Sequence, residues 1–244
     1  MTHKDISIVI PVYNEQDNLK PLISELQEVL RDVGRPYEIV FVDDGSCDHS
    51  LKILKNAASY DPQIRVIRFK KNAGQTAAFD AGFRAARGEI IITMDADLQN
   101  DPHAIPRLLK KIGKYDVVCG WRHKRKDPWI KIISSKIANF VRNMLSQEEI
   151  VDTGCSLKAF RRECLQTVKL FNGMHRFLPT LVKMEGFTVT QVKVNHRPRR
   201  FGTTKYNIRN RMVRAFIDLL AVRWMKRRRL NYEIEEIIDE QSDD

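Results

Sequence analysis

The most restrictive feature of this sequence is the alternation of short apolar runs with amphipathic stretches over its first 120 residues. The apolar runs are rich in Val and Ile, which favour strands. The stretches between them carry apolar residues at three- and four-residue spacing, which predicts helices. The predicted strands are 6–10, 38–42, 64–69, 89–94 and 116–120, and the predicted helices are 15–31, 48–59, 74–87 and 102–113.

Strands that are apolar throughout and alternate with helices indicate a parallel sheet with helices on both faces. The second half of the chain is less regular. There we expect helices near 130–146, 175–185 and 206–228, and strands at 155–160 and 187–194. The predicted fold class is therefore α/β, with a mostly parallel central sheet flanked by helices.

Polar residues gather where three of the predicted strands end. The first strand is followed by Pro11–Glu15, the second by Asp43–Ser46 and the fourth by Asp95–Gln99. Open α/β sheets bind their ligands outside the carboxyl ends of the strands. We therefore expect these three segments to converge on one edge of the sheet.

Asp95 and Asp97 are the most informative of these residues. Two carboxylates held so close repel each other unless a proton or a cation lies between them. Mg²⁺ typically binds one or two carboxylates together with substrate phosphates, and Gln99 is placed to add an oxygen or to hold a metal-bound water. The alternative is that both aspartates only form a turn before the helix that begins at Pro102.

Positive charge is in excess: 42 Lys and Arg residues stand against 31 Asp and Glu residues, a net charge of +11. Such an excess points to nucleic acid, a membrane surface or a phosphorylated small molecule. Arg122 follows the fifth strand, and Arg199 and Lys205 lie on either side of a glycine-containing loop. These bases are candidates for stabilising a departing diphosphate; the alternative for each is a solvated surface charge.

Other kinds of site are not expected. The sequence lacks the glycine-rich patterns of dinucleotide-binding and P-loop proteins. Its 4 cysteines form no C-x-x-C pair, and its 6 histidines show no metal-binding spacing, so we expect neither a disulfide framework nor a zinc site. Aromatic residues are not interleaved with the basic clusters, so nucleic acid is not the expected partner.

Eight segments of the chain resemble a known family. They are PVYNE (11–15), VDDGSCD (42–48), NAGQTAAFDAGFRAARGEII (72–91), MDADLQNDP (94–102), GWR (120–122), DTGCSLKAF (152–160), RFLP (176–179) and RRFGTTKYN (199–207). Together they resemble the family 2 glycosyltransferases, and within them the dolichol-phosphate mannose synthases and other polyprenyl-phosphate glycosyltransferases. The resemblance covers about residues 5–228.

This resemblance implies a GT-A fold, a nucleotide-sugar donor (a GDP- or UDP-hexose of the mannose or glucose type), Mg²⁺ or Mn²⁺, and inversion at the anomeric carbon. The GT-A domain would be 1–205, with a nucleotide-binding half of about 1–120 and an acceptor half of about 121–205. The implied nucleotide-sugar-binding residues are Pro11, Tyr13, Glu15, Val42, Asp44, Asp95, Ala96, Asp97, Arg122, Arg199 and Lys205. The implied metal ligands are Asp95, Asp97 and Gln99, and the implied catalytic residues are Asp97, Arg122, Arg199 and Lys205.

The chain departs from the family at its acceptor segment. Many members that glycosylate a hydroxyl carry a Glu-Asp pair there as general base, whereas 153–160 reads TGCSLKAF and only Asp152 precedes it. A hydroxyl nucleophile needs a base, but a phosphate is already ionised at neutral pH. We therefore expect a polyprenyl (dolichyl or undecaprenyl) phosphate acceptor. The alternative is a saccharide hydroxyl in cell-envelope polysaccharide synthesis, with Asp152 as a weak base.

The C-terminal region divides by charge. Residues 197–229 hold twelve Lys or Arg residues and one acid, whereas 230–244 hold seven acids and no base, which predicts a solvated tail. The 206–229 segment reads as a basic amphipathic helix, which suits an anionic membrane surface. The alternatives are docking on its own domain, on a second copy of the chain or on a membrane partner protein. With no signal sequence or spanning segment recognised, we expect a cytoplasmic enzyme bound peripherally to the membrane face.

Overall fold

The computed structural model describes residues 4–122, 150–199, 208–230, 232 and 235–236. The strands are β1 (Ile6–Val12), β2 (Tyr37–Asp43), β3 (Ile64–Arg68), β4 (Ile90–Thr93), β5 (Val117–Arg122), β6 (Lys158–Arg161) and β7 (Val189–Val194). The α-helices are α1 (Gln16–Val33), α2 (Ser50–Tyr60), α3 (Gln75–Ala85), α4 (Ile105–Ile112), α6 (Arg162–Gln166), α7 (Leu178–Met184) and α8 (Ile208–Arg227); the 3₁₀ helices are η1 (Pro102–Ala104) and η2 (Met174–Phe177).

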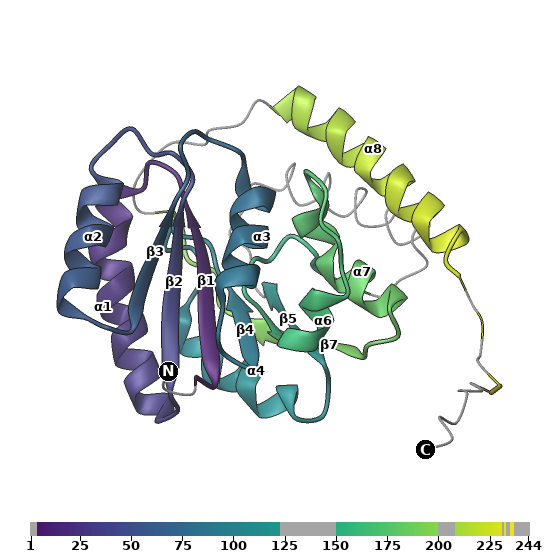
Figure 1. Cartoon of the computed structure of the whole chain (residues 1–244), viewed down its shortest axis with the longest axis horizontal. Helices are drawn as coiled ribbons and strands as arrows, with labels where there is room; N and C mark the ends of the chain where they lie inside the picture. Colours follow the sequence, from purple (N-terminus) through teal and green to yellow (C-terminus); the bar gives the residue numbers. More distant parts are fainter. Residues whose placement is uncertain (1–3, 123–149, 200–207, 231, 233–234, 237–244) are drawn as a thin grey trace, which may run out of the picture.

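All seven strands join one sheet in the order β3-β2-β1-β4-β6-β5-β7 (Figure 1). Neighbouring strands are parallel except at β6, which is antiparallel to both β4 and β5. The predicted α/β class and mostly parallel sheet are therefore confirmed. The predicted halves, which meet near residue 120, contribute strands to the same sheet.

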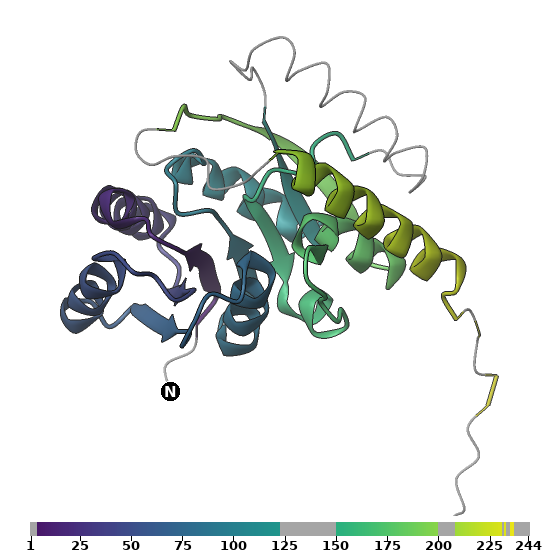
Figure 2. The ribbon, with the colours of Figure 1, turned by 90° about the horizontal axis from the view of Figure 1, so that it is seen from above.

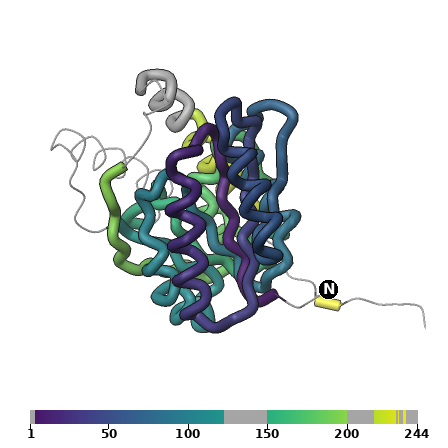
Figure 3. Tube along the Cα trace, turned by 90° about the vertical axis from the view of Figure 1, so that its left-hand side faces the viewer, coloured from purple at the N-terminus to yellow at the C-terminus, as the bar shows by residue number. Residues whose placement is uncertain are grey.

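Helices cover both faces of the sheet, as Figure 2 shows from above. The α1, α2 and α4 helices pack on one face through Leu19, Leu54 and Leu108, and Figure 3 shows α1 and α2 side by side there. The α3, α6 and α7 helices pack on the other face. Strands buried on both sides explain why the apolar runs show no alternation with polar residues.

The predicted elements agree with the structure except at their bounds. The strand expected at 155–160 begins at Lys158, and the one expected at 187–194 begins at Val189. The helix expected at 130–146, residues 206–207 of the last helix and most of the predicted tail lie outside the described residues. Within the described part of the chain, no helix combines the length and the apolar character that crossing a bilayer requires.

The α8 helix docks on the rest of the chain through one of its faces. Leu219 and Val222 are buried in a cluster with Met174 and Phe177 of η2 and with α7, so α8 runs beside α7 (Figures 1 and 2). Docking of this helix on its own domain, one of the alternatives left open by the sequence, is thus observed for this face.

A buried carboxylate joins the strands at the sheet edge opposite their carboxyl ends. Glu38 of β2 is 1% exposed; it accepts hydrogen bonds from the Ser7 hydroxyl (2.7 Å), from Arg65 (2.8 Å) and from the Arg87 backbone N–H. Burial by itself raises the pKa of Glu38, but these donors outweigh burial, so its pKa lies below the usual value. Glu38 therefore ties β1, β2, β3 and the turn before β4 together as an anion.

We predict that Glu38→Gln lowers the free energy of unfolding by about 2 kcal/mol at pH 7, because hydrogen bonds to a charged group are lost. Since folding lowers the pKa of Glu38, its contribution is complete above about pH 4.3, the pKa in an unfolded chain. It is lost as the pH falls through the lower folded-state pKa, so the difference between variant and parent should shrink there. Urea unfolding at several pH values measures this difference.

Asp80→Asn is the matched control, because Asp80 pairs with Arg84 on an exposed surface and should not change stability measurably. If Glu38→Gln lowered the free energy of unfolding by the same amount at every pH, the prediction would be contradicted.

Candidate active site

The segments that follow β1 and β2 meet at one edge of the sheet. These strands are parallel neighbours, with Val12 paired to Asp43 at their ends. The Asp44 backbone N–H donates to the Val12 carbonyl (2.8 Å), and the Asn14 N–H donates to the Ser46 hydroxyl (3.0 Å). The structure thus brings together two of the three segments that the sequence placed at the site.

Asp44 holds the loop that precedes α3. Its carboxylate accepts hydrogen bonds from the N–H groups of Ala73 (2.6 Å) and Gly74 (2.9 Å) and from the Asn72 side chain (2.8 Å). Burial raises the pKa of Asp44, and the backbone donors only partly oppose this effect. Asp44 therefore shapes this wall of the site, and its predicted contact with a nucleotide stays a prediction.

Gly45 permits the close approach of that loop. Its φ is +70°, and a Cβ placed there would lie 2.7 Å from the Asn72 backbone nitrogen. Any side chain would therefore both strain the backbone and push the 72–74 loop away from Asp44. This requirement accounts for the glycine in the Asp-Asp-Gly-Ser segment.

The remaining residues predicted to line the nucleotide pocket differ in exposure. Tyr13 is 36% exposed, and Pro11 and Glu15 are half-buried. Glu15 accepts a hydrogen bond from the Asn18 side chain (2.6 Å). Val42 is fully buried and packs in the core beside α3. Tyr13 and Glu15 therefore present accessible groups, whereas Val42 acts first as a core residue.

The third segment joins the other two through α3. The side chain of Gln75, the first residue of α3, donates to the Asp95 carboxylate (2.7 Å), directly after the 72–74 loop held by Asp44. Burial raises the pKa of Asp95, and the negative charge of Asp97 raises it further. Lys158 and Arg122 oppose this rise through their positive charges. Asp95 and Asp97 are therefore close enough to interact, as the sequence predicted.

The turn that follows the two carboxylate residues is strained. Leu98 has a φ of +60°, a conformation that is uncommon for a bulky side chain, and it is almost completely buried. Such conformations persist where the surroundings fix them, and they often occur at functional sites. This turn points the Asp97 carboxylate at Arg199, whose guanidinium donates to it (2.8 Å), while Ala96 is buried beneath. Arg199 thus lies at the Asp-x-Asp segment, and its predicted role in phosphate binding stays a prediction.

Arg122 lies at the end of β5 and forms a two-pronged ion pair with Asp152. Its Nε and one terminal nitrogen donate to the two carboxylate oxygens (2.7 and 2.8 Å), and its backbone N–H donates as well (3.3 Å). Both side chains are largely buried, at 15% and 11% exposed. Burial lowers the pKa of Arg122, but the Asp152 carboxylate outweighs it and keeps the guanidinium charged. Each oxygen of Asp152 is therefore already engaged by a strong donor.

Three polar residues near Asp95, namely Gln75, Ser156 and Lys158, were not singled out from the sequence. Gln75 lies inside the NAGQTAAF segment, and its contact with Asp95 spans 20 residues. Lys158 is 4% exposed, and its ammonium donates to the Cys155 carbonyl. Nothing in the sequence shows that a lysine in a short strand is buried. Gln75 could have been found from the sequence, because it lies in segment 72–91, one of those that resemble the family. Lys205, also predicted, lies outside the described residues.

A second acidic group lies nearby but already contains a cation. Glu25, Asp101 and His103 place ligand-type atoms within 4.8 Å of one another. The Arg197 guanidinium donates to Glu25 (2.6 Å) and to Asp101 (2.7 Å). Because Arg197 supplies the positive charge, we do not assign a metal to this group.

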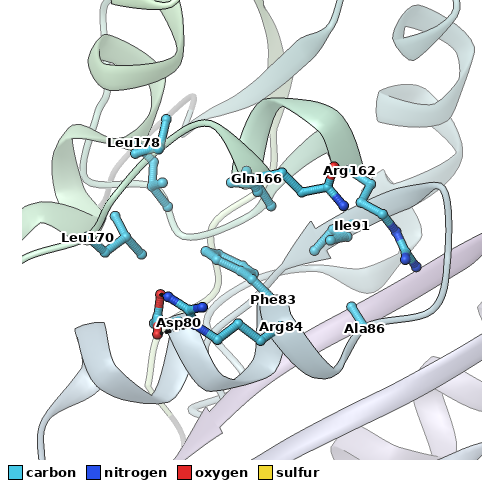
Figure 4. A pocket seen from close by; sticks show the side chains of 11 residues that line it. Asp80, Phe83, Arg84, Ala86, Ile91, Arg162, Gln166, Leu170 and Leu178 are labelled. Carbon is cyan, nitrogen blue, oxygen red and sulfur yellow. Dashed lines mark hydrogen bonds and ion pairs between the residues drawn. The ribbon is translucent and has the colours of Figure 1, made fainter.

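A pocket of about 300 Å³ lies between α3 and α6. Figure 4 shows Phe83 pointing into it, with Arg84 turned toward Asp80 and Arg162 at one side. Its lining includes none of the residues predicted for the site. This pocket is therefore distinct from the strand-end site.

Comparison with known protein families identifies the family to which this chain belongs. The model of the family described as "Glycosyl transferase family 2" matches residues 7–169, which hold all of the site's described residues except Arg197 and Arg199. The chain is a family 2 glycosyltransferase. The predicted membership of this family is thus confirmed.

Two curated proteins have sequences similar to that of this glycosyltransferase. An undecaprenyl-phosphate 4-deoxy-4-formamido-L-arabinose transferase of Pectobacterium carotovorum is 38% identical over 221 residues, which are 89% of this chain and 67% of the relative. A dodecaprenyl-phosphate galacturonate synthase of Rhizobium johnstonii is 36% identical over 232 residues, 91% of this chain and 68% of the relative. Both belong with the polyprenyl-phosphate branch that the motifs resemble.

Solved structures support the GT-A fold. Glucosyl-3-phosphoglycerate synthase of Mycobacterium tuberculosis, in complex with Mn²⁺, uridine diphosphate and phosphoglyceric acid, matches with a TM-score of 0.70 at 17% identity, covering 91% of this chain and 78% of that chain. A mannosyltransferase of Pyrobaculum calidifontis, in complex with GDP-mannose and Mn²⁺, matches with a TM-score of 0.64 at 20% identity, covering 91% and 64%. At these identities the likeness concerns the fold.

The Asp95–Gln99 segment of this glycosyltransferase suits a hard divalent cation. Asp95 and Asp97 repel each other, which the raised pKa of Asp95 reflects, and a cationic guanidinium already lies against Asp97. Carboxylate and amide oxygens are the ligands that Mg²⁺ and Mn²⁺ prefer. Asp95, Asp97 and Gln99 would hold the cation.

We predict that Asp97→Asn reduces turnover by on the order of 100-fold, because the site would lose one of the two carboxylates expected to hold the cation. EDTA should abolish turnover reversibly, with recovery on addition of Mn²⁺. Nucleotide release from a nucleotide-sugar donor measures both effects, and circular dichroism checks the fold. Asp80→Asn, an exposed aspartate of α3, should keep the parent rate; undiminished turnover in EDTA would contradict the metal assignment.

Proposed function

We propose that this glycosyltransferase transfers a sugar from a nucleoside diphosphate donor to a polyprenyl phosphate, in one displacement that inverts the anomeric carbon. The observation that carries the proposal is the Arg122–Asp152 ion pair at the acceptor side. Asp152 is the acid that a hydroxyl acceptor would need as base. Both of its oxygens accept hydrogen bonds from Arg122, at 2.7 and 2.8 Å, and one also accepts from Gly154 N–H at 3.2 Å.

An engaged carboxylate is a poor general base. A proton that Asp152 accepted would have to displace a guanidinium hydrogen bond in a largely buried site. A phosphate acceptor avoids this cost because it arrives already ionised. The names of the relatives, undecaprenyl-phosphate and dodecaprenyl-phosphate enzymes at 36–38% identity, agree with such an acceptor.

The proposed reaction forms one bond and breaks one. A phosphate oxygen of the acceptor attacks the anomeric carbon, and the bond from that carbon to the diphosphate oxygen breaks, so that a nucleoside diphosphate leaves. Mg²⁺ or Mn²⁺, when bound, would neutralise charge on the leaving diphosphate. Arg199 and Lys205 are proposed to bind its phosphates, and Arg122 to add positive charge beside Asp95.

Two features of the donor are still to be identified: its sugar and its nucleobase. The family resemblance implied a mannose- or glucose-type hexose, whereas the relatives are named for a formamido-arabinose and a galacturonate. Solved GT-A neighbours were crystallised with uridine diphosphate and with GDP-mannose. We retain the hexose as the proposed sugar and test it beside a pentose and a uronate on both nucleotides.

We predict that the protein with Mn²⁺ and a donor panel makes a glycosyl phosphate lipid from a short polyprenyl phosphate but no product from the matching polyprenol. The two acceptors share the chain and differ only in the nucleophile, so the comparison isolates the need for a base. Mass spectrometry identifies the product. Transfer to the polyprenol or to a saccharide hydroxyl, with none to the phosphate, would instead favour the polysaccharide alternative.

The exposed face of α8 is proposed to hold the enzyme at the membrane. Ile217, Leu220 and Trp224 are 58%, 45% and 64% exposed, on the side of the helix away from the buried Leu219 and Val222. At spacings of three and four residues they form one strip. Four consecutive bases, Lys226 to Arg229, follow the strip.

An anionic bilayer matches this arrangement. Apolar and aromatic side chains enter the headgroup boundary, while each base near the surface contributes about 1 kcal/mol. The proposed acceptor is itself a membrane lipid, so attachment at the cytoplasmic face would place donor and acceptor at one surface. The charge term is screened over about 8 Å at physiological salt, so binding should be reversible and sensitive to salt.

We predict that changing Lys226, Arg227, Arg228 and Arg229 to Gln releases the protein from anionic vesicles but preserves turnover on a short water-soluble polyprenyl phosphate. Vesicle flotation with anionic and neutral lipids measures binding. The control changes four exposed lysines of α2 and α4, Lys52, Lys55, Lys110 and Lys111, and so removes the same charge elsewhere. If both variants float as the parent does, α8 is not the anchor; if both are released, net charge rather than α8 drives binding.

A further inference from the structure

The segment after β7 runs antiparallel to the segment that carries the Asp-x-Asp carboxylates. Two backbone contacts define this pairing: His196 forms an isolated β-bridge with Asn100, and the Arg197 N–H donates to the Gln99 carbonyl. Arg199 lies two residues beyond the last backbone hydrogen bond and reaches Asp97 through its side chain, across the Leu98 turn. The contacts are Asn195 to Asp101 (3.2 Å), His196 to Asn100 by a β-bridge, the Arg197 N–H to the Gln99 carbonyl (2.9 Å) and Arg199 to Asp97 (2.8 Å).

Arg197 fixes this register through its side chain. Its two terminal nitrogens donate to both oxygens of Glu25 in α1 (2.9 and 2.6 Å), and one of them also donates to Asp101 (2.7 Å). Arg197 is 27% exposed, and its two partners are 19% and 12% exposed. A planar guanidinium can serve two carboxylates at once, which a lysine cannot do with the same geometry.

A shift of this pairing would move Arg199 away from Asp97. Side chains alternate between the two faces of an extended strand, so a slip by one residue reverses the face that each side chain occupies. Two contacts of the Arg197 side chain, with Glu25 of α1 and with Asp101 at the N-cap of η1, oppose such a slip. Arg199 itself makes a partly exposed ion pair, and such pairs alone hold a segment weakly.

We propose that Arg197 is a positioning residue that sets the register of the 195–199 segment and thereby delivers Arg199 to Asp97. The inference rests on the proposed function, because Asp97 is taken to face the cation and the diphosphate. In the absence of donor, Arg199 then competes with a divalent cation for Asp97. Once the donor is bound, Arg199 lies beside the diphosphate that it is proposed to stabilise.

This role predicts two effects of opposite sign for Arg197→Gln. Mn²⁺ binding without donor should become tighter, by about fivefold, because the competing guanidinium is no longer held on Asp97. The gain should vanish in the Asp97→Asn background; a gain that persists there would instead report Mn²⁺ at the Glu25–Asp101–His103 group that Arg197 vacates. Turnover should fall by about tenfold, because Arg199 is no longer placed against the leaving group. A variant that merely loosens the fold would weaken both Mn²⁺ binding and turnover.

Mn²⁺ titration followed by electron paramagnetic resonance, together with kcat, tests the proposal in a double-mutant cycle. Arg199→Gln should also tighten Mn²⁺ binding, and adding Arg197→Gln to it should change either quantity by less than about twofold, since one residue acts through the other. Arg197→Lys should recover part of the effect. Arg84→Gln, which removes the Arg84–Asp80 pair seen in Figure 4, is the control and should match the parent.

The outcomes separate this inference from the proposed function. Additive losses in kcat, or weaker Mn²⁺ binding in Arg197→Gln, would overturn the positioning role. A parent enzyme that forms no glycosyl phosphate, with the Mn²⁺ pattern intact, would overturn the proposed acceptor while supporting the register.

Discussion

The repulsion between Asp95 and Asp97 is the constraint on which the rest of the site depends. Two carboxylates on one strained turn, partly removed from water, are unfavourable unless positive charge and hydrogen-bond donors surround them. The structure supplies these from four separate parts of the chain. Gln75 donates to Asp95, Arg199 donates to Asp97, and Lys158 and Arg122 lower the pKa that burial and Asp97 raise. The two carboxylates are thus already surrounded by positive charge and hydrogen-bond donors before a nucleotide sugar binds.

The same arrangement limits the chemistry available at the acceptor side. Arg122 provides charge near Asp95 only because Asp152 holds it, and Asp152 is thereby occupied. One ion pair consequently strengthens the diphosphate side and removes the nearest candidate base from the acceptor side. This coupling favours an acceptor that brings its own negative charge, which links the electrostatics of the site to the proposed phosphate nucleophile.

The sequence predicted what local patterns determine and missed what distant pairing determines. The apolar runs predicted β1, β2 and β4, and parallel packing then brought Tyr13, Asp44 and Asp95 to one edge. Apolar content does not reveal strand direction, so the antiparallel β6 was not foreseen. Arg122 was predicted as a diphosphate-stabilising residue but without its partner Asp152, and Arg197 was only counted among the basic residues of 197–229. Their partners lie 30, 96 and 172 residues away, distances over which a single sequence carries no signal.

Chain connectivity relates the two ends of the proposed mechanism. Arg197 fixes the segment that ends at Arg199, and the buried face of α8 fixes the helix that begins at Ile208. Nine peptide steps join these points, which can span at most about 30 Å. The exposed strip begins at Ile217, about 14 Å further along the helix, so chain connectivity keeps the proposed membrane-binding strip within about 45 Å of Arg199.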